Sequence, residues 1–192
     1  LPEVESSLRT LQAVADAVHT VLGYGQWQRY LLVFQNPNEL RATGGFLGSF
    51  ALMDVADGAV TRLEVPGGGP YDLEGASLVR VMAPVPLRML HATRHGEWQF
   101  WDANWWPDFP TSARKLAWFY ERARGPSVDG VIAITAPFLE RVLAVTGPVP
   151  MPAYGVTVTA ENFIAETQAQ VELLYDQTQN RPKQFIADLA SV

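Results

Sequence analysis

The sequence predicts an α/β fold with helices packed on both faces of a mixed β-sheet, and three observations point to it. The 192 residues are 48% hydrophobic and 18% charged, which is typical of a globular chain with a full apolar core. The first half contains apolar runs joined by a short turn, the pattern of a β-hairpin. The second half alternates helical and strand patterns. No linker divides residues 1–192, so we expect one domain.

The first half is expected to form one helix followed by three strands. Apolar residues recur at helical spacing until Gly23, which predicts an amphipathic helix that ends there. A continuous apolar run predicts a buried strand, and two later stretches predict an antiparallel pair that turns at Gly58. The run PGGGP at 66–70 predicts a mobile loop that could lie over a site. The expected elements are a helix over 5–22 and strands over 29–34, 45–55 and 60–65.

The second half is expected to alternate helices with strands. Thr111 or Ser112 is the expected N-cap of the first of these helices, and Thr159 that of a later one. Pro137 in a first turn and Gly147 at an end delimit a helix between them. The expected elements are helices over 111–123 and 136–147, a buried strand over 129–134, a strand and a helix within 157–176, and a helix within 182–192.

The composition excludes several classes of function. The net charge of −6, with only 14 Lys and Arg residues, argues against a nucleic-acid partner. The absence of cysteine removes thiolate catalysis and zinc–thiolate sites. No apolar stretch reaches the ~18 residues of a membrane span. Because the chain opens at Leu1 without a Met, we expect it to be a fragment of a longer protein.

The stretch NELRATGGF, residues 38–46, is the first candidate site. It follows a predicted strand, and open α/β sheets place ligands at strand ends. The guanidinium of Arg41 could hold a phosphate or carboxylate in a bidentate way, and the backbone at Gly44 and Gly45 could approach an anion. The alternative is a structured loop in which Arg41 pairs with an acid and the glycines form a bulge.

The stretch EWQFWDANWWPDFP, residues 97–110, is the second candidate site. Aromatic walls with interleaved polar groups suit a sugar or a polyprenyl chain, but the same rings could instead fill the core beneath a long loop. Asp102 and Asp108 could hold Mg²⁺ together with phosphate oxygens. His91 and His95 lack an HExxH pattern, and no GxSxG, Walker A or GxGxxG motif occurs.

Four segments of the chain resemble the bacterial family catalogued as domain of unknown function 4012. They are LLVFQNPNELRATGGFLGSFALMDVADGAV, DANWWPDFPTSARKLAWFY, VDGVIAITAPFLERVLAVTGPV and TVTAENF, in this order along most of the chain. The resemblance implies a domain outside the cytoplasm, anchored to the cell membrane by a segment outside this chain.

A more distant likeness is to the LytR–CpsA–Psr family of cell-wall glycopolymer ligases. LRATGGF would take the place of that family's first motif, with Arg41 as its arginine. The family's aspartate after the arginine is replaced by Ala42 and Thr43, and its later proline–arginine–aspartate motif is missing near Pro66. Those enzymes act with Mg²⁺ on a polyprenyl-pyrophosphate-linked polymer, whose lipid lies in an apolar tunnel between sheet and helices.

Together these observations predict a cell-envelope domain that binds or transfers a polyprenyl-phosphate-linked glycopolymer. If the domain is an enzyme, Arg41 and Asp108 are the expected catalytic residues, and Asp102 and Asp108 the expected metal ligands. The expected ligand-binding residues are Asn36, Glu39, Thr43, Gly44, Gly45, Asn104, Trp105 and Arg114.

Two alternatives stay open at the level of sequence. In one, the domain is not catalytic and binds a glycan or a protein through exposed rings of the Trp-rich loop. In the other, the two candidate stretches lock onto each other as a scaffold, with Arg41 buried and paired with Asp108 or Glu39.

Overall fold

The computed structural model describes residues 2–90, 96–176 and 178–191, and the chain has the mixed α/β architecture that the sequence predicts. His91 and His95 lie outside the described residues. The helices are α1 (Pro2–Val21), α2 (Tyr71–Ala76), α3 (Val85–Leu90), α4 (Phe109–Arg122), α5 (Ala136–Thr146), α6 (Phe163–Gln168) and α7 (Gln184–Leu189), with single turns η2 (Phe100–Asp102), η3 (Pro152–Tyr154) and η4 (Ala169–Leu173). The strands are β1 (Gln28–Asn36), β2 (Phe46–Ala56), β3 (Ala59–Glu64), β4 (Gly130–Thr135), β5 (Val149–Met151) and β6 (Val156–Val158).

The main sheet has four strands in the order β3-β2-β1-β4. The expected hairpin is confirmed, because β2 pairs with β3 in antiparallel register and also with β1. Strand β4 runs parallel to β1, with Leu32 opposite Ile132 and Phe34 opposite Ile134. The carboxyl ends of β1 and β4 therefore lie beside the start of β2, at one end of the strands.

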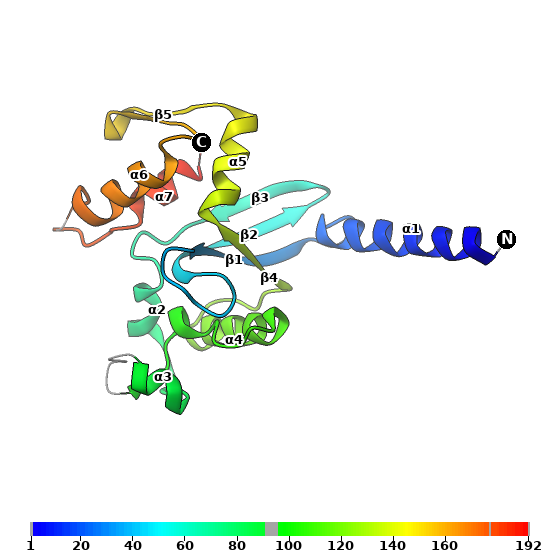
Figure 1. Ribbon diagram of the computed structural model, residues 1–192, viewed down its shortest axis with the longest axis horizontal. Helices are drawn as coiled ribbons and strands as arrows, with labels where there is room; N and C mark the ends of the chain where they lie inside the picture. The colour runs from blue at the N-terminus through cyan, green and yellow to red at the C-terminus, as the bar shows by residue number, and fades with distance from the viewer. Residues whose placement is uncertain (1, 91–95, 177, 192) are drawn as a thin grey trace.

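The two faces of the sheet pack differently. Leu31 and Val33 of β1 point into a core that also contains Phe50, Phe100 and Leu116, so η2 and α4 cover this face. A second, smaller core joins β5, β6, α6 and α7 around Met151, Val158, Phe163 and Phe185. Figure 1 shows α4 on one side of the sheet and α5, α6 and α7 on the other.

Four local expectations are wrong. Helix α6 begins after Asn162, which takes the N-cap position expected for Thr159. Helix α4 starts two residues early because Asp108, not Thr111 or Ser112, is its N-cap. All six residues of β4 are half-buried rather than buried, since β4 is an edge strand. The glycines of PGGGP are buried, and the loop is tied to α7 by the hydrogen bond from Lys183 N to Gly67 O (2.7 Å).

Helix α1 leaves the body of the protein altogether. Figure 1 shows it projecting beyond the sheet as a separate rod, and all of its residues from Glu3 to Val21 are exposed. None of the described helices has both the length and the apolar character needed to cross a membrane.

Candidate functional site

The two stretches that the sequence singles out meet in space. The side-chain nitrogen of Asn104 donates to Thr43 Oγ1 (2.9 Å) and to the carbonyl of Gly45 (2.8 Å). Gln35, at the end of β1, donates to the same hydroxyl from the other side (2.5 Å). Asn104 is 1% exposed, so these bonds join the loop after β1 to the segment after η2 inside the protein. We call Gln35, Arg41, Thr43, Gly45, Asp102 and Asn104 the clasp.

Arg41 is held inside the clasp. Its Nε lies 3.9 Å from Asp102 Oδ1, its Nη1 donates to the carbonyl of Leu40 (3.0 Å), and its guanidinium stacks on the ring of Phe46 (5.0 Å). The ion-pair partner is therefore Asp102, and the expectation that Arg41 pairs with Asp108 or Glu39 is wrong. The guanidinium thus contacts the protein on several sides, although its buried Nε makes no hydrogen bond within the described residues.

The glycines of this loop serve its close packing. A Cβ on Gly45 would come within 2.4 Å of the carbonyl oxygen of Asn36, so only glycine fits there. The N–H of Gly44 donates to Arg41 O (3.1 Å) and that of Phe46 to Glu39 O (2.9 Å). These two amides are thus already used within the loop instead of being presented to an anion.

Asp108 and Arg114 lie on α4, where they act locally. Asp108 Oδ2 accepts from Thr111 N (3.0 Å), and this hydrogen bonding lowers the pKa of the carboxyl. Arg114 donates to Thr111 Oγ1 (3.0 Å). Among the described residues no three His, Asp or Glu side chains converge as metal ligands, and Asp102 faces a guanidinium.

The tryptophans of the second stretch face inward. Trp98 is buried and donates from Nε1 to Asp102 O (2.9 Å). Trp101, Trp105 and Trp106 are half-buried and pack against the first core. Trp105, expected to touch a ligand, is thus a packing residue of the core's rim.

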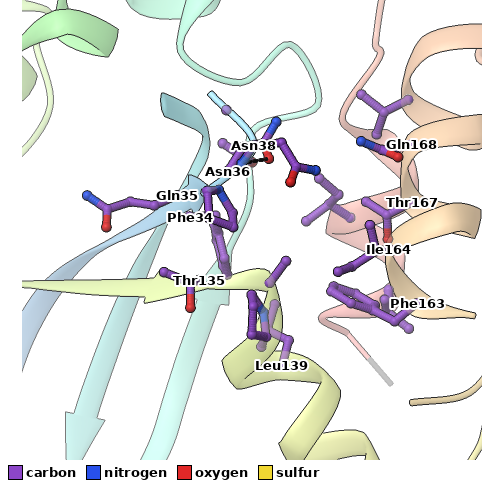
Figure 2. Close-up of a pocket in the computed structure, with 18 of the residues that line it drawn as sticks. Phe34, Gln35, Asn36, Asn38, Thr135, Leu139, Phe163, Ile164, Thr167 and Gln168 are labelled. Carbon is purple, nitrogen blue, oxygen red and sulfur yellow. Dashed lines mark hydrogen bonds between the residues drawn. The ribbon is translucent and has the colours of Figure 1, made fainter. Parts of the chain in front are cut away.

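A separate pocket opens where β1 and β4 end. It has a volume of about 480 Å³ and lies between the ends of these strands, α5 and α6. In Figure 2, Phe163, Ile164 and Thr167 of α6 face Phe34 and Leu139 across it, whereas Gln35 points away. We call it the α6 pocket. Its apolar lining comes from Phe34, Phe46, Leu139, Leu143, Phe163, Ile164, Val171 and Ile186.

Apart from Gln35, the amide side chains labelled in Figure 2 lie at one end of the α6 pocket, whereas its hydroxyls, among them Thr135 and Thr167, are spread along the walls. Figure 2 shows Asn36, Asn38 and Gln168 together, away from Leu139 and Phe163. The N–H of Asn38 donates to Asn36 Oδ1 (3.1 Å), which fixes the start of the loop. Asn36 and Glu39, two of the expected ligand-binding residues, line this end. The polar lining also includes Glu172 and Lys183.

Lys183 is the one cation among the described residues that line the α6 pocket. Burial lowers the pKa of its ammonium, and the charges of Glu172 and Glu39 act in the opposite direction. The buried glycine loop positions it: Lys183 N bonds to Gly67 O, and a Cβ on Gly69 would come within 2.9 Å of Lys183 Cγ. The result is a partly desolvated positive charge at the polar end of an apolar cavity.

Two hydroxyls in the α6 pocket have no partner within the described part of the chain. Ser49 Oγ and Thr167 Oγ1 are both buried and make no hydrogen bond there. A buried polar atom without a partner costs free energy, which a bound polar group would recover. These hydroxyls favour a ligand that carries oxygen atoms as well as an apolar part.

Sequence reasoning missed most of this pocket. Thr167, Gln168, Glu172 and Lys183 belong to no motif, and they lie more than a hundred residues beyond β1. The one available signal was a lysine directly before the apolar positions of the last predicted helix, Phe185, Ile186 and Leu189. Such a lysine is usually solvated, so the signal is weak by itself.

The comparisons identify a family without an assigned activity. A family model described as protein of unknown function (DUF4012) matches residues 26–171, and the chain therefore belongs to this family. No curated protein and no solved structure matches the chain significantly. The match includes the clasp and most of the α6 pocket, but it excludes α1 and α7.

Proposed function

We propose that this DUF4012 domain binds a polyprenyl-phosphate-linked glycan of the cell envelope, holding part of the lipid chain in the α6 pocket. The observation that carries the proposal is the apolar cavity of about 480 Å³, whose walls hold only isolated hydroxyls while the amides of Asn36, Asn38 and Gln168 lie at one end. Such a pocket suits an amphiphile, because its lipid chain would contact apolar side chains and its head group would contact polar ones. The site of action would be outside the cytoplasm, at the membrane from which the ligand comes.

The apolar end would take the chain. Phe34, Leu139 and Phe163 supply walls of carbon that cannot hydrogen-bond. Each methylene that moves from water into such surroundings contributes about 0.8 kcal/mol. A cavity of this volume holds one ligand of modest size, so a long polyprenyl chain would insert only part of its length.

The polar end would take the phosphate and the first sugar. Lys183 provides a charge for a phosphate oxygen, and the amides of Asn36, Asn38 and Gln168 can donate to and accept from hydroxyls. Two carboxylates and one ammonium leave this end with a formal charge of −1 (Glu39, Glu172 and Lys183). A pyrophosphate head is therefore expected to bind better with Mg²⁺, which neutralises part of the head's own charge.

In this proposal Lys183 binds the phosphate, whereas the sequence indicated Arg41 for that role. Arg41 does not line the α6 pocket, and its guanidinium is engaged with Asp102 and Phe46. The alternative of a platform for a glycan or a protein at the Trp-rich loop has less support, because its rings are buried or half-buried. The proposal concerns binding; transfer of the polymer would need reacting groups in addition.

A thermal-shift titration with farnesyl pyrophosphate tests the proposal, with farnesol and inorganic pyrophosphate as separate arms and Mg²⁺ present or absent. Ligand at about 100 times its dissociation constant stabilises a protein by roughly 2.7 kcal/mol, which corresponds to about 5–10 °C for a chain of this size. Farnesyl pyrophosphate should produce this rise, farnesol a smaller one and pyrophosphate almost none.

Two substitutions on α6 locate the binding. Thr167→Trp places an indole in the cavity and should abolish the rise, whereas Ala165→Trp on the exposed side of the same helix should preserve it. The absence of a rise in the wild type, or an equal loss in both variants, would contradict binding in the α6 pocket.

A further inference from the structure

Helix α1 carries a long apolar stripe that is exposed along its length in the described structure. Its large apolar residues are exposed by between 36% for Leu22, just beyond the helix, and 65% for Leu11. Helices in proteins gain most of their stability from packing an apolar face. A fully exposed α1 therefore lacks the partner that would account for its stripe.

The spacing of the stripe is that of a coiled coil. Apolar residues occur in alternating steps of four and three, which places them at the a and d positions of two complete heptads, 8–14 and 15–21, and at one further position on either side. These positions are Val4, Leu8, Leu11, Ala15, Val18 and Leu22. Val14 and Val21 widen the stripe along one flank and keep that flank free of charge.

The charges of α1 distinguish a protein partner from a lipid surface. Helices that lie on membranes carry Lys and Arg on the polar face. In α1 the polar side has Glu3, Glu5 and Asp16 but only Arg9 as a fixed cation, and Arg9 is already paired with Glu5 (2.5 Å). This acidic face would be repelled by anionic lipids, whereas it lies outside the a and d seam and does not oppose helix pairing.

The direction of α1 is fixed by its base. Gly58 N donates to Leu22 O (2.8 Å), Asp57 N to Gly23 O (3.1 Å) and Tyr30 Oη to Val21 O (3.0 Å). Gly23 has φ = +70°, and a Cβ there would lie 2.4 Å from Val55 O. Only glycine therefore fits in the link between α1 and the sheet. The helix is thus attached firmly to the β2–β3 turn and held away from the sheet (Figure 1).

We propose that α1 is a self-association element, which pairs with α1 of a second copy of this chain through the seam formed by Val4, Leu8, Leu11, Ala15, Val18 and Leu22. A second copy fits because it presents the same heptad register, so that each apolar layer meets another apolar layer. Helix α1 lies outside the family match at residues 26–171, so this role is separate from that of the α6 pocket.

Sedimentation equilibrium of the whole chain, from micromolar to submillimolar concentration, tests this. The mass should rise from 21.2 kDa toward twice that value as the concentration increases. The double variant Leu11→Glu/Val18→Glu charges two d positions and should stay monomeric. The matched variant Ala13→Glu/Thr20→Glu adds the same two charges, with the same spacing, on the opposite side of the helix and should associate like the wild type.

Several results would overturn the proposal. A wild type that stays monomeric at every concentration would do so, as would an equal loss of association in both double variants. Flotation with phosphatidylcholine vesicles, with and without phosphatidylglycerol, measures whether α1 binds a membrane instead of a second copy. A monomeric wild type that floats, while Leu11→Glu/Val18→Glu does not, would assign the stripe to membranes. Because both positions of the seam variant are exposed, its body is expected to melt as the wild type does.

Discussion

The clasp and the α6 pocket adjoin each other, since Gln35 of the clasp lines the pocket and Arg41 stacks on Phe46, another lining residue. Their polar groups differ in what they face. In the clasp, the Asn104 amide nitrogen bonds to the Thr43 hydroxyl and Arg41 faces Asp102, although Arg41 Nε and Asn104 Oδ1 are buried without a hydrogen bond in the described residues. In the pocket, Ser49, Thr167 and Lys183 face a cavity. A conspicuous motif can therefore be structural, while a site can consist of residues without a motif.

The largest expected effect is on stability, at the centre of the clasp. Asn104→Leu removes both hydrogen bonds to the loop after β1 and leaves the carbonyl of Gly45 without this donor. We expect a loss of about 2–4 kcal/mol in the free energy of unfolding, measured with urea. The exposed Asn38→Ala should cost less than about 0.5 kcal/mol. Similar losses in the two variants would contradict the distinction between clasp and surface.

The next effect concerns ligand affinity in the pocket. Lys183→Met removes the one cation from the lining and should weaken farnesyl pyrophosphate binding about 10- to 100-fold, as expected for a hydrogen bond to a charged group. Farnesol affinity should be unchanged. Because burial lowers the pKa of Lys183, its charge opposes folding, and the variant should melt at the same temperature as the wild type or higher. A variant that melts lower yet binds normally would make Lys183 a structural residue.

The ion pair between Arg29 and Asp54 in the sheet can be compared with the one between Arg41 and Asp102 in the clasp. Arg29 donates to both oxygens of Asp54 (2.7 and 2.9 Å), and this lowers the pKa of Asp54 from 3.8. The stability that Asp54 contributes is therefore present above pH 3.8 and is lost as the pH falls through the lower pKa of the folded state.

Asp54→Asn should destabilise the protein by about 1 kcal/mol at neutral pH and make urea unfolding less sensitive to acid. Asp57→Asn, in the exposed turn after β2, is the matched control and should change neither quantity. An unchanged acid sensitivity in Asp54→Asn would contradict the assigned role of the pair.

The smallest effect separates helix capping from metal binding at Asp108. Asp108→Ala should cost about 1 kcal/mol, whereas Asp108→Asn should cost little because asparagine is an equally good N-cap. Mg²⁺ should leave the melting temperature of the wild type unchanged in the absence of ligand. A rise with Mg²⁺ that both variants abolish would restore the expectation of a metal site.

Much of the fold could be predicted from periodicity alone. The hairpin of β2 and β3, the strand β4 and the helix α5 follow from local apolar spacing and from glycine and proline at their ends. The position of the α4 cap was not predicted, because Asp108, Thr111 and Ser112 are all good cap residues and tertiary packing decides among them.

The site was harder to predict than the fold. The meeting of the two stretches was one of three alternatives, but the expected link was Arg41 with Asp108 or Glu39, whereas Asn104 provides it. An apolar tunnel between sheet and helices was expected from the resemblance alone, but most of the lining of the α6 pocket was not, since Phe34, Leu139 and Thr167 come from three distant segments. A cavity depends on what packing leaves empty, and the spacing of residues along one segment does not record that.

The account's central claim is that ligand binds in the α6 pocket while Arg41 belongs to the structure. Isothermal titration of farnesyl pyrophosphate into the wild type and Arg41→Gln, in the presence of Mg²⁺, tests it most directly. We expect equal dissociation constants, together with a lower melting temperature for Arg41→Gln because Asp102 loses its ion pair. A variant that keeps the wild-type melting temperature but loses binding would contradict the claim and indicate that Arg41 binds the phosphate.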